Sequence, residues 1–153
     1  YNDAKFKSFP NAPAPVGSGQ TNQDLSGRRM PFVSEIQSNV TPALRFPVVD
    51  LVPVPAFVPR DLAVTAALDV IYRSNLYLDS DLDPRSRQDE YVMLDGRVRF
   101  TTFDGALSLA VLVDNILDED VFELAVDSLL FPGGFRVLQE FQRTYGVEMR
   151  YSF

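Results

Sequence analysis

The clearest feature of this chain is a period-two alternation of apolar and polar side chains, which is typical of β-strands with one apolar and one polar face. Five runs show it, at residues 34–46, 62–73, 92–103, 107–114 and 145–153. Within these runs the charged residues fall on the parity opposite to the apolar residues. The pattern predicts five strands, and a less regular run at residues 1–9 predicts the end of a sixth.

The connections between these runs differ strongly in length. A tight hairpin turn is predicted at Asp104-Gly105. Long polar connections are predicted at residues 10–30, 75–90 and 118–142. Long loops at one end of the strands and short turns at the other are the layout of outer-membrane barrels. Two departures are expected: Pro42 makes the first strand irregular, and the proline-rich segment 47–60 forms an irregular insertion.

Composition narrows the possible functions. The chain is 46% hydrophobic and 12% aromatic, enough to form an ordered structure, and it lacks an apolar run long enough for a membrane-spanning helix. Its net charge of -7 argues against a nucleic-acid partner. It has neither cysteine nor histidine, which excludes disulfides, thiolate metal sites and the common nucleophile–histidine pairs. We therefore expect neither an enzyme nor a bound cofactor.

Several segments together resemble one protein family. The strand Asp69-Val70-Ile71-Tyr72-Arg73-Ser74, the run Asp114-Asn115-Ile116-Leu117-Asp118-Glu119-Asp120 and the ending from Arg143 to Phe153 are similar, in this order, to the C-terminal part of TonB-dependent outer-membrane receptors. The segment from Leu82 to Tyr91 resembles a loop of that family, and Tyr1-Asn2-Asp3-Ala4 resembles an upstream strand end. The resemblance covers almost the whole chain, with the proline-rich segment as a departure, so residues 1–153 are interpreted as the C-terminal portion of such a receptor barrel.

The resemblance implies an all-β fold, an antiparallel up-and-down transmembrane β-barrel of twenty-two strands, of which this chain would supply about the last six. Six strands cannot close a barrel of this class, so we expect a piece of a larger protein whose plug domain is absent here. The implied function is TonB-energised uptake of a scarce bulky nutrient, such as a ferric siderophore or a carbohydrate, across the outer membrane of a Gram-negative bacterium. Two alternatives are a passive porin or small structural barrel, and a soluble β-sandwich binding module.

The same resemblance implies the partners. These are outer-membrane lipid and lipopolysaccharide, the barrel-assembly machinery, TonB through the missing plug, and a small-molecule ligand such as a metal chelate. The apolar parity, which includes Leu68, Val70, Val98, Leu109, Val111 and Val147, is expected to face lipid. In the last strand, the same parity carries a predicted interface girdle that also serves as the assembly signal: Tyr145, Val147, Met149, Tyr151 and Phe153.

The opposite parity is expected to line the barrel lumen. Its charged residues are Arg45, Asp69, Arg73, Asp95, Arg97, Arg99, Glu148 and Arg150, together with Glu35 and Asp114. They would contact the plug and the transport path, or only pair with one another across strands.

Two loop segments are further candidates. The loop from Glu123 to Gln142 is a possible ligand contact through Phe131, Phe135 and Arg136, or it packs on its neighbours. The acidic run from Asp79 to Asp83 imitates calcium-loop spacing, but Pro84 stands where such a loop needs glycine. A loose divalent contact at the lipopolysaccharide surface is the alternative to a solvated acidic loop; we predict the solvated loop and no metal site.

Overall fold

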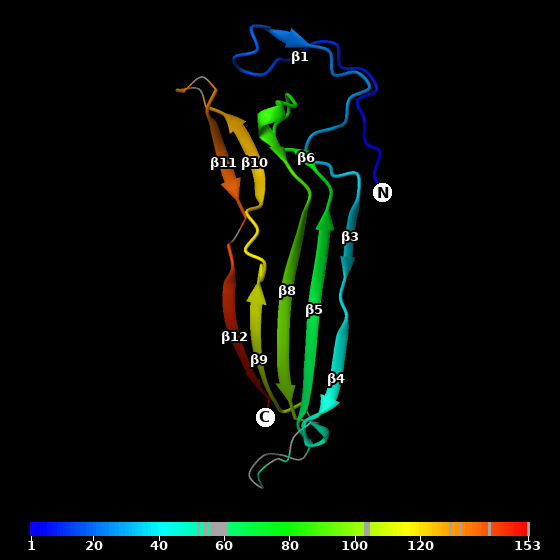
Figure 1. Ribbon diagram of the computed structural model, residues 1–153, viewed down its shortest axis with the longest axis vertical. Helices are drawn as coiled ribbons and strands as arrows, with labels where there is room; N and C mark the ends of the chain where they lie inside the picture. Colours follow the sequence, from blue (N-terminus) through cyan, green and yellow to red (C-terminus); the bar gives the residue numbers. More distant parts are fainter. Residues whose placement is uncertain are drawn as a thin grey trace. The chain divides into compact units, whose positions relative to one another are not determined.

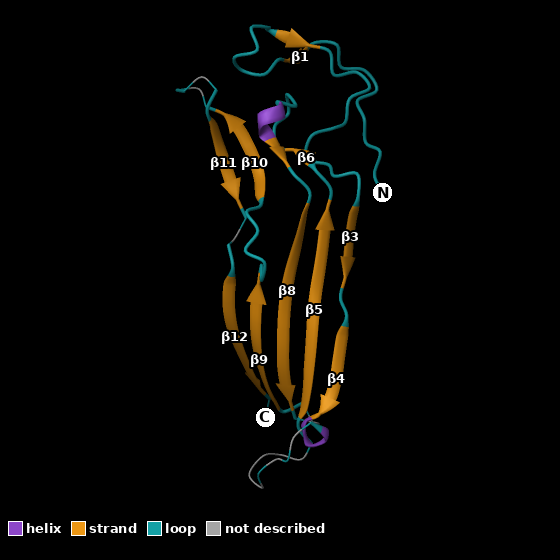
Figure 2. Ribbon diagram, viewed as in Figure 1, coloured by secondary structure: helices purple, strands orange, loops and turns teal. Residues whose placement is uncertain are grey.

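Strands are the main regular structure of the described residues. The computed structural model describes residues 1–51, 53, 55, 61–102, 105–128, 130–131, 133–140 and 142–152. Apart from strands, these residues form only two one-turn 3₁₀ helices, η1 (Val48–Asp50) and η2 (Pro84–Ser86) (Figure 2). Among the residues described, none lies in a helix long and apolar enough to cross a membrane. The predicted all-β, antiparallel fold class is confirmed at this level.

The chain divides into two compact units. We call the first the loop unit, because it collects the long connections: Tyr1–Ser38, Tyr72–Val92 and Glu119–Phe141. We call the second the sheet unit; it consists of Asn39–Ile71, Met93–Asp118 and Gln142–Phe153. The alternation of these segments along the chain means that each long connection leaves the sheet and returns to it.

The main sheet has six antiparallel strands in the order β12-β9-β8-β5-β3, with β4 also pairing with β5 (Figure 1). The strands are β3 (Gln37–Val40), β4 (Ala43–Pro47), β5 (Ala63–Arg73), β8 (Tyr91–Thr101), β9 (Leu107–Asp114) and β12 (Thr144–Tyr151). The described strands form an open sheet and not a closed barrel.

The first predicted strand is interrupted. The run at residues 34–46 forms two strands, β3 and β4, separated by Thr41 and Pro42. Pro42 has no N–H to give to the ladder, but its carbonyl still accepts from the Leu68 N–H at 3.1 Å. The sequence therefore locates the irregularity correctly, and β5 bridges it by pairing with both halves.

The two faces of this sheet differ as the alternation predicts. Val98, Leu109, Val111 and Val147 are 40–74% exposed, while Leu68 and Val70 are half-buried. Among the described residues of the sheet unit, the buried hydrophobic side chains are Ala63, Met93 and Ala110. These few small or flexible side chains do not form a core, so the apolar face has no second layer packed on it within the described part of this unit.

The loop unit contains three small hairpins that the sequence analysis assigned to loops. They pair β1 (Ala12–Pro13) with β2 (Asn22–Gln23), β6 (Leu76–Tyr77) with β7 (Arg87–Gln88), and β10 (Phe122–Asp127) with β11 (Phe135–Gln139). Ala12, Leu25 and Leu82 form a small core with Phe6, Phe9 and Tyr77 packed against it.

One predicted strand is absent. Residues 1–9 are not a strand; they make a single bridge, Lys5 to Arg29. Apolar and polar residues do not alternate regularly in this run. Its backbone bonds to the following loop; for example, the Phe6 N–H donates to the Arg28 carbonyl at 2.9 Å.

Two turns lie partly beyond the described residues. Half of the proline-rich insertion, and Asp104 of the predicted tight turn, are outside them. What is described of that turn agrees with a tight hairpin: Gly105 has φ +74° and donates its N–H to the Thr102 carbonyl at 2.9 Å.

Candidate functional site

The acidic segment of the loop unit forms a compact turn between β6 and β7. The Leu78 N–H donates to the Ser86 carbonyl at 2.9 Å and closes the base of the turn. Asp83 caps η2: its Oδ1 accepts from the Arg85 N–H at 2.8 Å, and Pro84 stands where a helix needs no N–H. Asp83 is only 1% exposed, so this cap is part of the interior of the turn.

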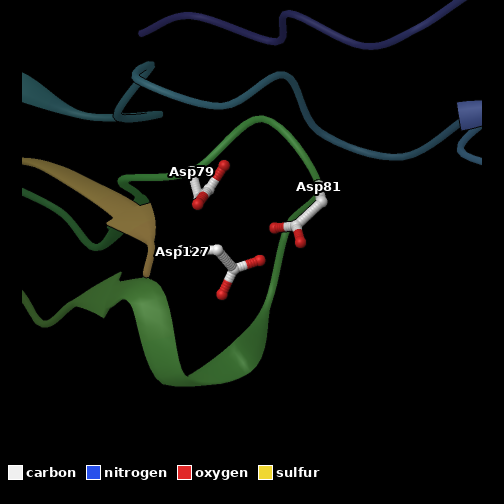
Figure 3. A group of neighbouring side chains, drawn as sticks. All are labelled: Asp79, Asp81 and Asp127. Atoms are coloured by element: carbon white, nitrogen blue, oxygen red, sulfur yellow. The ribbon is translucent and has the colours of Figure 1, made fainter. Parts of the chain in front are cut away.

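Three carboxylates converge at this turn (Figure 3). Asp79 and Asp81 belong to the turn and Asp127 to the end of β10, and their oxygens lie within 4.8 Å of one another. Asp79 and Asp81 are 8% and 5% exposed, and Oδ1 of Asp127 is buried with no hydrogen-bond partner among the described residues. The predicted solvated acidic loop is therefore wrong here, because β10 lies beside the turn, with the Ala125 N–H bonded to the Leu78 carbonyl at 3.0 Å.

The environment of Asp81 favours its protonated form. Burial raises the pKa of Asp81, and the carboxylates of Asp79 and Asp127 raise it further, although the Asp83 N–H bonded to Asp81 opposes the shift. Carboxylate oxygens are also the ligands of hard cations such as Ca²⁺, and the cluster offers three of the six or more that such an ion takes. Chemically, this arrangement can share a proton or neutralise a cation. The expectation of no metal site stays a prediction.

Sequence reasoning missed Asp127. It lies far along the chain from Asp79 and inside a segment assigned to a loop. The weak alternation over residues 122–127 was the signal that could have placed it on a strand.

Arg85 connects three segments of the loop unit. Its Nε lies 3.1 Å from both carboxylate oxygens of Asp83, and this hydrogen-bonded ion pair lowers the pKa of that carboxyl. The guanidinium also donates to the carbonyls of Val16, at 3.1 Å, and Gly133, at 3.3 Å. It lies 5.2 Å from the ring centroid of Phe135 and borders a hollow of about 370 Å³. Arg85 therefore holds the tips of two loops against the acidic turn.

The predicted ligand-contact loop is a hairpin and not an irregular loop. Phe135 begins β11 and is half-buried against Arg85, whereas Phe131 and Arg136 are exposed. The position of Phe135 agrees with packing on a neighbour. Ligand contact through Phe131 and Arg136 stays a prediction.

In the sheet unit, the segment Asp114–Asp118 ends β9 with a tightly bonded turn. The Asn115 N–H donates to Asp95 Oδ1 at 2.8 Å, and Asn115 takes a left-handed conformation with φ +51°. Arg143 then donates to the Asn115 carbonyl at 3.4 Å and pairs with Asp118 at 3.4 Å. The residues that carry the family resemblance at this point thus shape a strand end.

Three of the predicted lumen-facing arginines gather at one hollow on the polar face of the sheet. Arg45 comes from β4, and Arg97 and Arg99 come from β8. The hollow has a volume of about 330 Å³, and Thr65, Ala67 and Thr101 complete its lining. We call it the arginine pocket. Arg45 lies directly opposite Thr65 in the β4–β5 register, which places the Arg45 side chain at the pocket edge.

Arg99 is the member of this group that meets a carboxylate. Arg99, Ala110 and Glu148 are cross-strand neighbours on β8, β9 and β12. Because Ala110 is small, Arg99 Nη2 reaches over it to within 3.6 Å of Glu148 Oε1. Arg150 approaches the same carboxylate, at 3.8 Å. The Nε of Arg99 is buried and has no hydrogen-bond partner in the described structure.

The remaining predicted wall charges lie elsewhere. Asp69 accepts from the Thr41 hydroxyl, and Asp114 accepts from the Thr144 hydroxyl at 2.9 Å. Arg73 belongs to the loop unit, where it lines a hollow of about 160 Å³ with Tyr91 and Glu123. Glu35, in the same unit, pairs with Arg29 at 3.0 Å. The structure thus brings only part of the predicted set together, and the role of these charges stays a prediction.

The apolar parity of the final strand is exposed. Tyr145, Val147, Met149 and Tyr151 are all exposed on β12. Phe153 lies outside the described residues. The girdle and assembly role of this set stays a prediction.

Comparison with models of known protein families gave no match, and comparisons with curated proteins and with solved structures gave no significant match.

Proposed function

We propose that residues 1–153 form the C-terminal strands of a TonB-dependent receptor barrel in the outer membrane of a Gram-negative bacterium. The complete protein would import a scarce bulky nutrient, such as a ferric siderophore, with energy transmitted through TonB and a plug domain. The strands described here would supply part of the barrel wall.

The exposed apolar face of the sheet is the observation that carries this proposal. Val98, Val111 and Val147 are exposed on three neighbouring strands, while the opposite face carries Arg97, Arg99 and Glu148. Hydrocarbon outside and charge inside is the arrangement of a barrel wall. An exposed apolar surface of this extent in water would instead be a site of association.

The same observation weighs against a soluble β-sandwich, whose apolar faces pack on each other. Among the described residues no second sheet covers this face. A passive porin would share the wall and differ only in needing no energy.

The first experiment tests which face meets lipid. The chain has no cysteine, so single replacements can carry an environment-sensitive fluorophore without background from these residues. Val111→Cys and Val147→Cys, made in the full-length protein and reconstituted in vesicles, should be quenched by brominated phospholipids. Their strand neighbours Leu112→Cys and Glu148→Cys are the matched controls, because the next residue on a strand faces the other side.

Equal quenching on both parities, or none on either, would contradict the membrane wall. Uptake of radiolabelled iron from a ferric siderophore, with and without a protonophore and in cells lacking TonB, then separates energised import from passive diffusion. Uptake that persists in both conditions would favour the passive porin.

A further inference from the structure

On the polar face of the sheet, most carboxylates are bonded to neutral donors and not to the arginines of the pocket. Asp69, Asp95 and Asp114 each accept a hydrogen bond from a neutral donor: a hydroxyl of Thr41 or Thr144, or the Asn115 N–H. None of these carboxylates pairs with an arginine of the pocket in the described structure. Glu148 is the carboxylate that does; of the three pocket arginines it approaches Arg99, and it also lies near Arg150 outside the pocket.

The arginine pocket is therefore left with excess positive charge. Arg45 and Arg97 form no ion pair with any described residue, and the buried Nε of Arg99 has no acceptor there. These donors surround a hollow of about 330 Å³, which is at the lower end of the range for small-molecule sites. The hydroxyls of Thr65 and Thr101 border the same hollow.

We propose that the arginine pocket binds a small ligand that carries at least two oxyanion groups, either phosphates or carboxylates. The planar guanidinium matches the paired oxygens of both groups, and such charge-assisted hydrogen bonds are stronger than neutral ones. The two unpaired guanidiniums call for two negative charges. Arg99 lines the same hollow, so its guanidinium is a third positive charge beside the ligand, shared with Glu148.

This site is separate from the proposed membrane function. It requires only that the polar face remain accessible, so it can exist in a transporter, a passive barrel or a soluble protein. Its failure would leave the lipid-facing test untouched.

The test is isothermal titration of the purified full-length protein with pyrophosphate and with citrate, with neutral maltose as a blank. We expect at least one anion to bind with saturation, and the better of the two identifies the oxyanion class. Arg45→Gln and Arg97→Gln should each weaken binding by about tenfold, as expected for the loss of one charged hydrogen-bond donor. Arg28→Gln removes the same charge from an exposed arginine of the loop unit that does not line the pocket, and it should leave the affinity unchanged.

Glu148→Gln should change the affinity in the opposite direction. Because Glu148 competes with the ligand for Arg99, its neutralisation should tighten binding severalfold, which damage to the fold would not do. The proposal is overturned if neither anion binds, if Arg28→Gln weakens binding as much as Arg97→Gln, or if Glu148→Gln fails to tighten it. If an acidic segment of the protein's own chain occupies the pocket, neither anion will bind.

Discussion

Replacing Asp127 with asparagine should stabilise the closed acidic turn of the loop unit at neutral pH. Asp127 brings a third carboxylate to Asp79 and Asp81, and its Oδ1 is buried without a hydrogen-bond partner among the described residues. The substitution removes one negative charge, keeps the side-chain volume and supplies an N–H₂ donor that can reach the neighbouring carboxylates. Loss of this negative charge is thus expected to stabilise the closed turn.

The size of the effect follows from the separation of the charges. Two unit charges at the 4.8 Å limit of this cluster repel by about 3 kcal/mol at an effective dielectric constant of about 20. The nearby positive charge of Arg85 offsets part of this repulsion. We therefore expect Asp127→Asn to raise the free energy of opening the turn by about 1–2 kcal/mol.

The effect should depend on pH in a defined direction. Since the pKa of Asp81 is raised, this carboxyl holds its proton more tightly in the closed turn than in the open chain. Its contribution to stability is complete below the open-chain pKa of about 4 and is lost as the pH rises through the raised value. The gain from Asp127→Asn should accordingly be large at pH 8 and small at pH 4.

Native-state hydrogen exchange measures this opening free energy. The amides of residues 78–88 and 122–127 would be followed in the full-length protein, with EDTA present to remove bound cations. Asp89→Asn is the matched control, because Asp89 is exposed in the same segment and pairs with Arg87. Reduced protection in Asp127→Asn at pH 8, or an equal gain in the control, would refute the electrostatic argument.

Three further predictions concern other parts of the chain. Arg85→Ala should speed limited proteolysis near residues 15–18 and 133–135 severalfold, because Asp83 loses its cation and two carbonyls lose their donor. Arg85→Lys should restore the resistance to proteolysis only in part, and an unchanged cleavage pattern in Arg85→Ala would contradict this role of Arg85. Val111→Arg should destabilise the barrel by about 2–4 kcal/mol if the residue lies at the bilayer midplane, and it should lower the assembled fraction measured by heat modifiability. Leu112→Arg, on the other face of the same strand, should not, and equal losses in the two variants would count against the predicted facing. Deleting Phe153 should lower the surface-exposed amount found by protease shaving while uptake per assembled molecule stays nearly intact, and normal assembly would remove the predicted signal.

The sequence by itself determined the strands of the main sheet and the facing of their side chains. The run at residues 92–103 covers all of β8 (Tyr91–Thr101) except its first residue, and the run at 62–73 contains β5, which spans Ala63–Arg73. This succeeds because side-chain alternation is a local property of an extended chain and needs no knowledge of neighbours. The break in the first strand at Pro42 was predictable for the same reason, because the lack of a backbone N–H follows from the residue type alone.

Only the tertiary structure decided which side chains meet. Asp127 joins Asp79 and Asp81 because β10 lies beside the acidic turn, and no local pattern predicts that neighbour. Arg99 reaches Glu148 because register places the small Ala110 between them, and register depends on turns and partner strands. The hairpins of the loop unit were missed because their strands are short and weakly alternating, so long-range hydrogen bonds stabilise them more than local preference does.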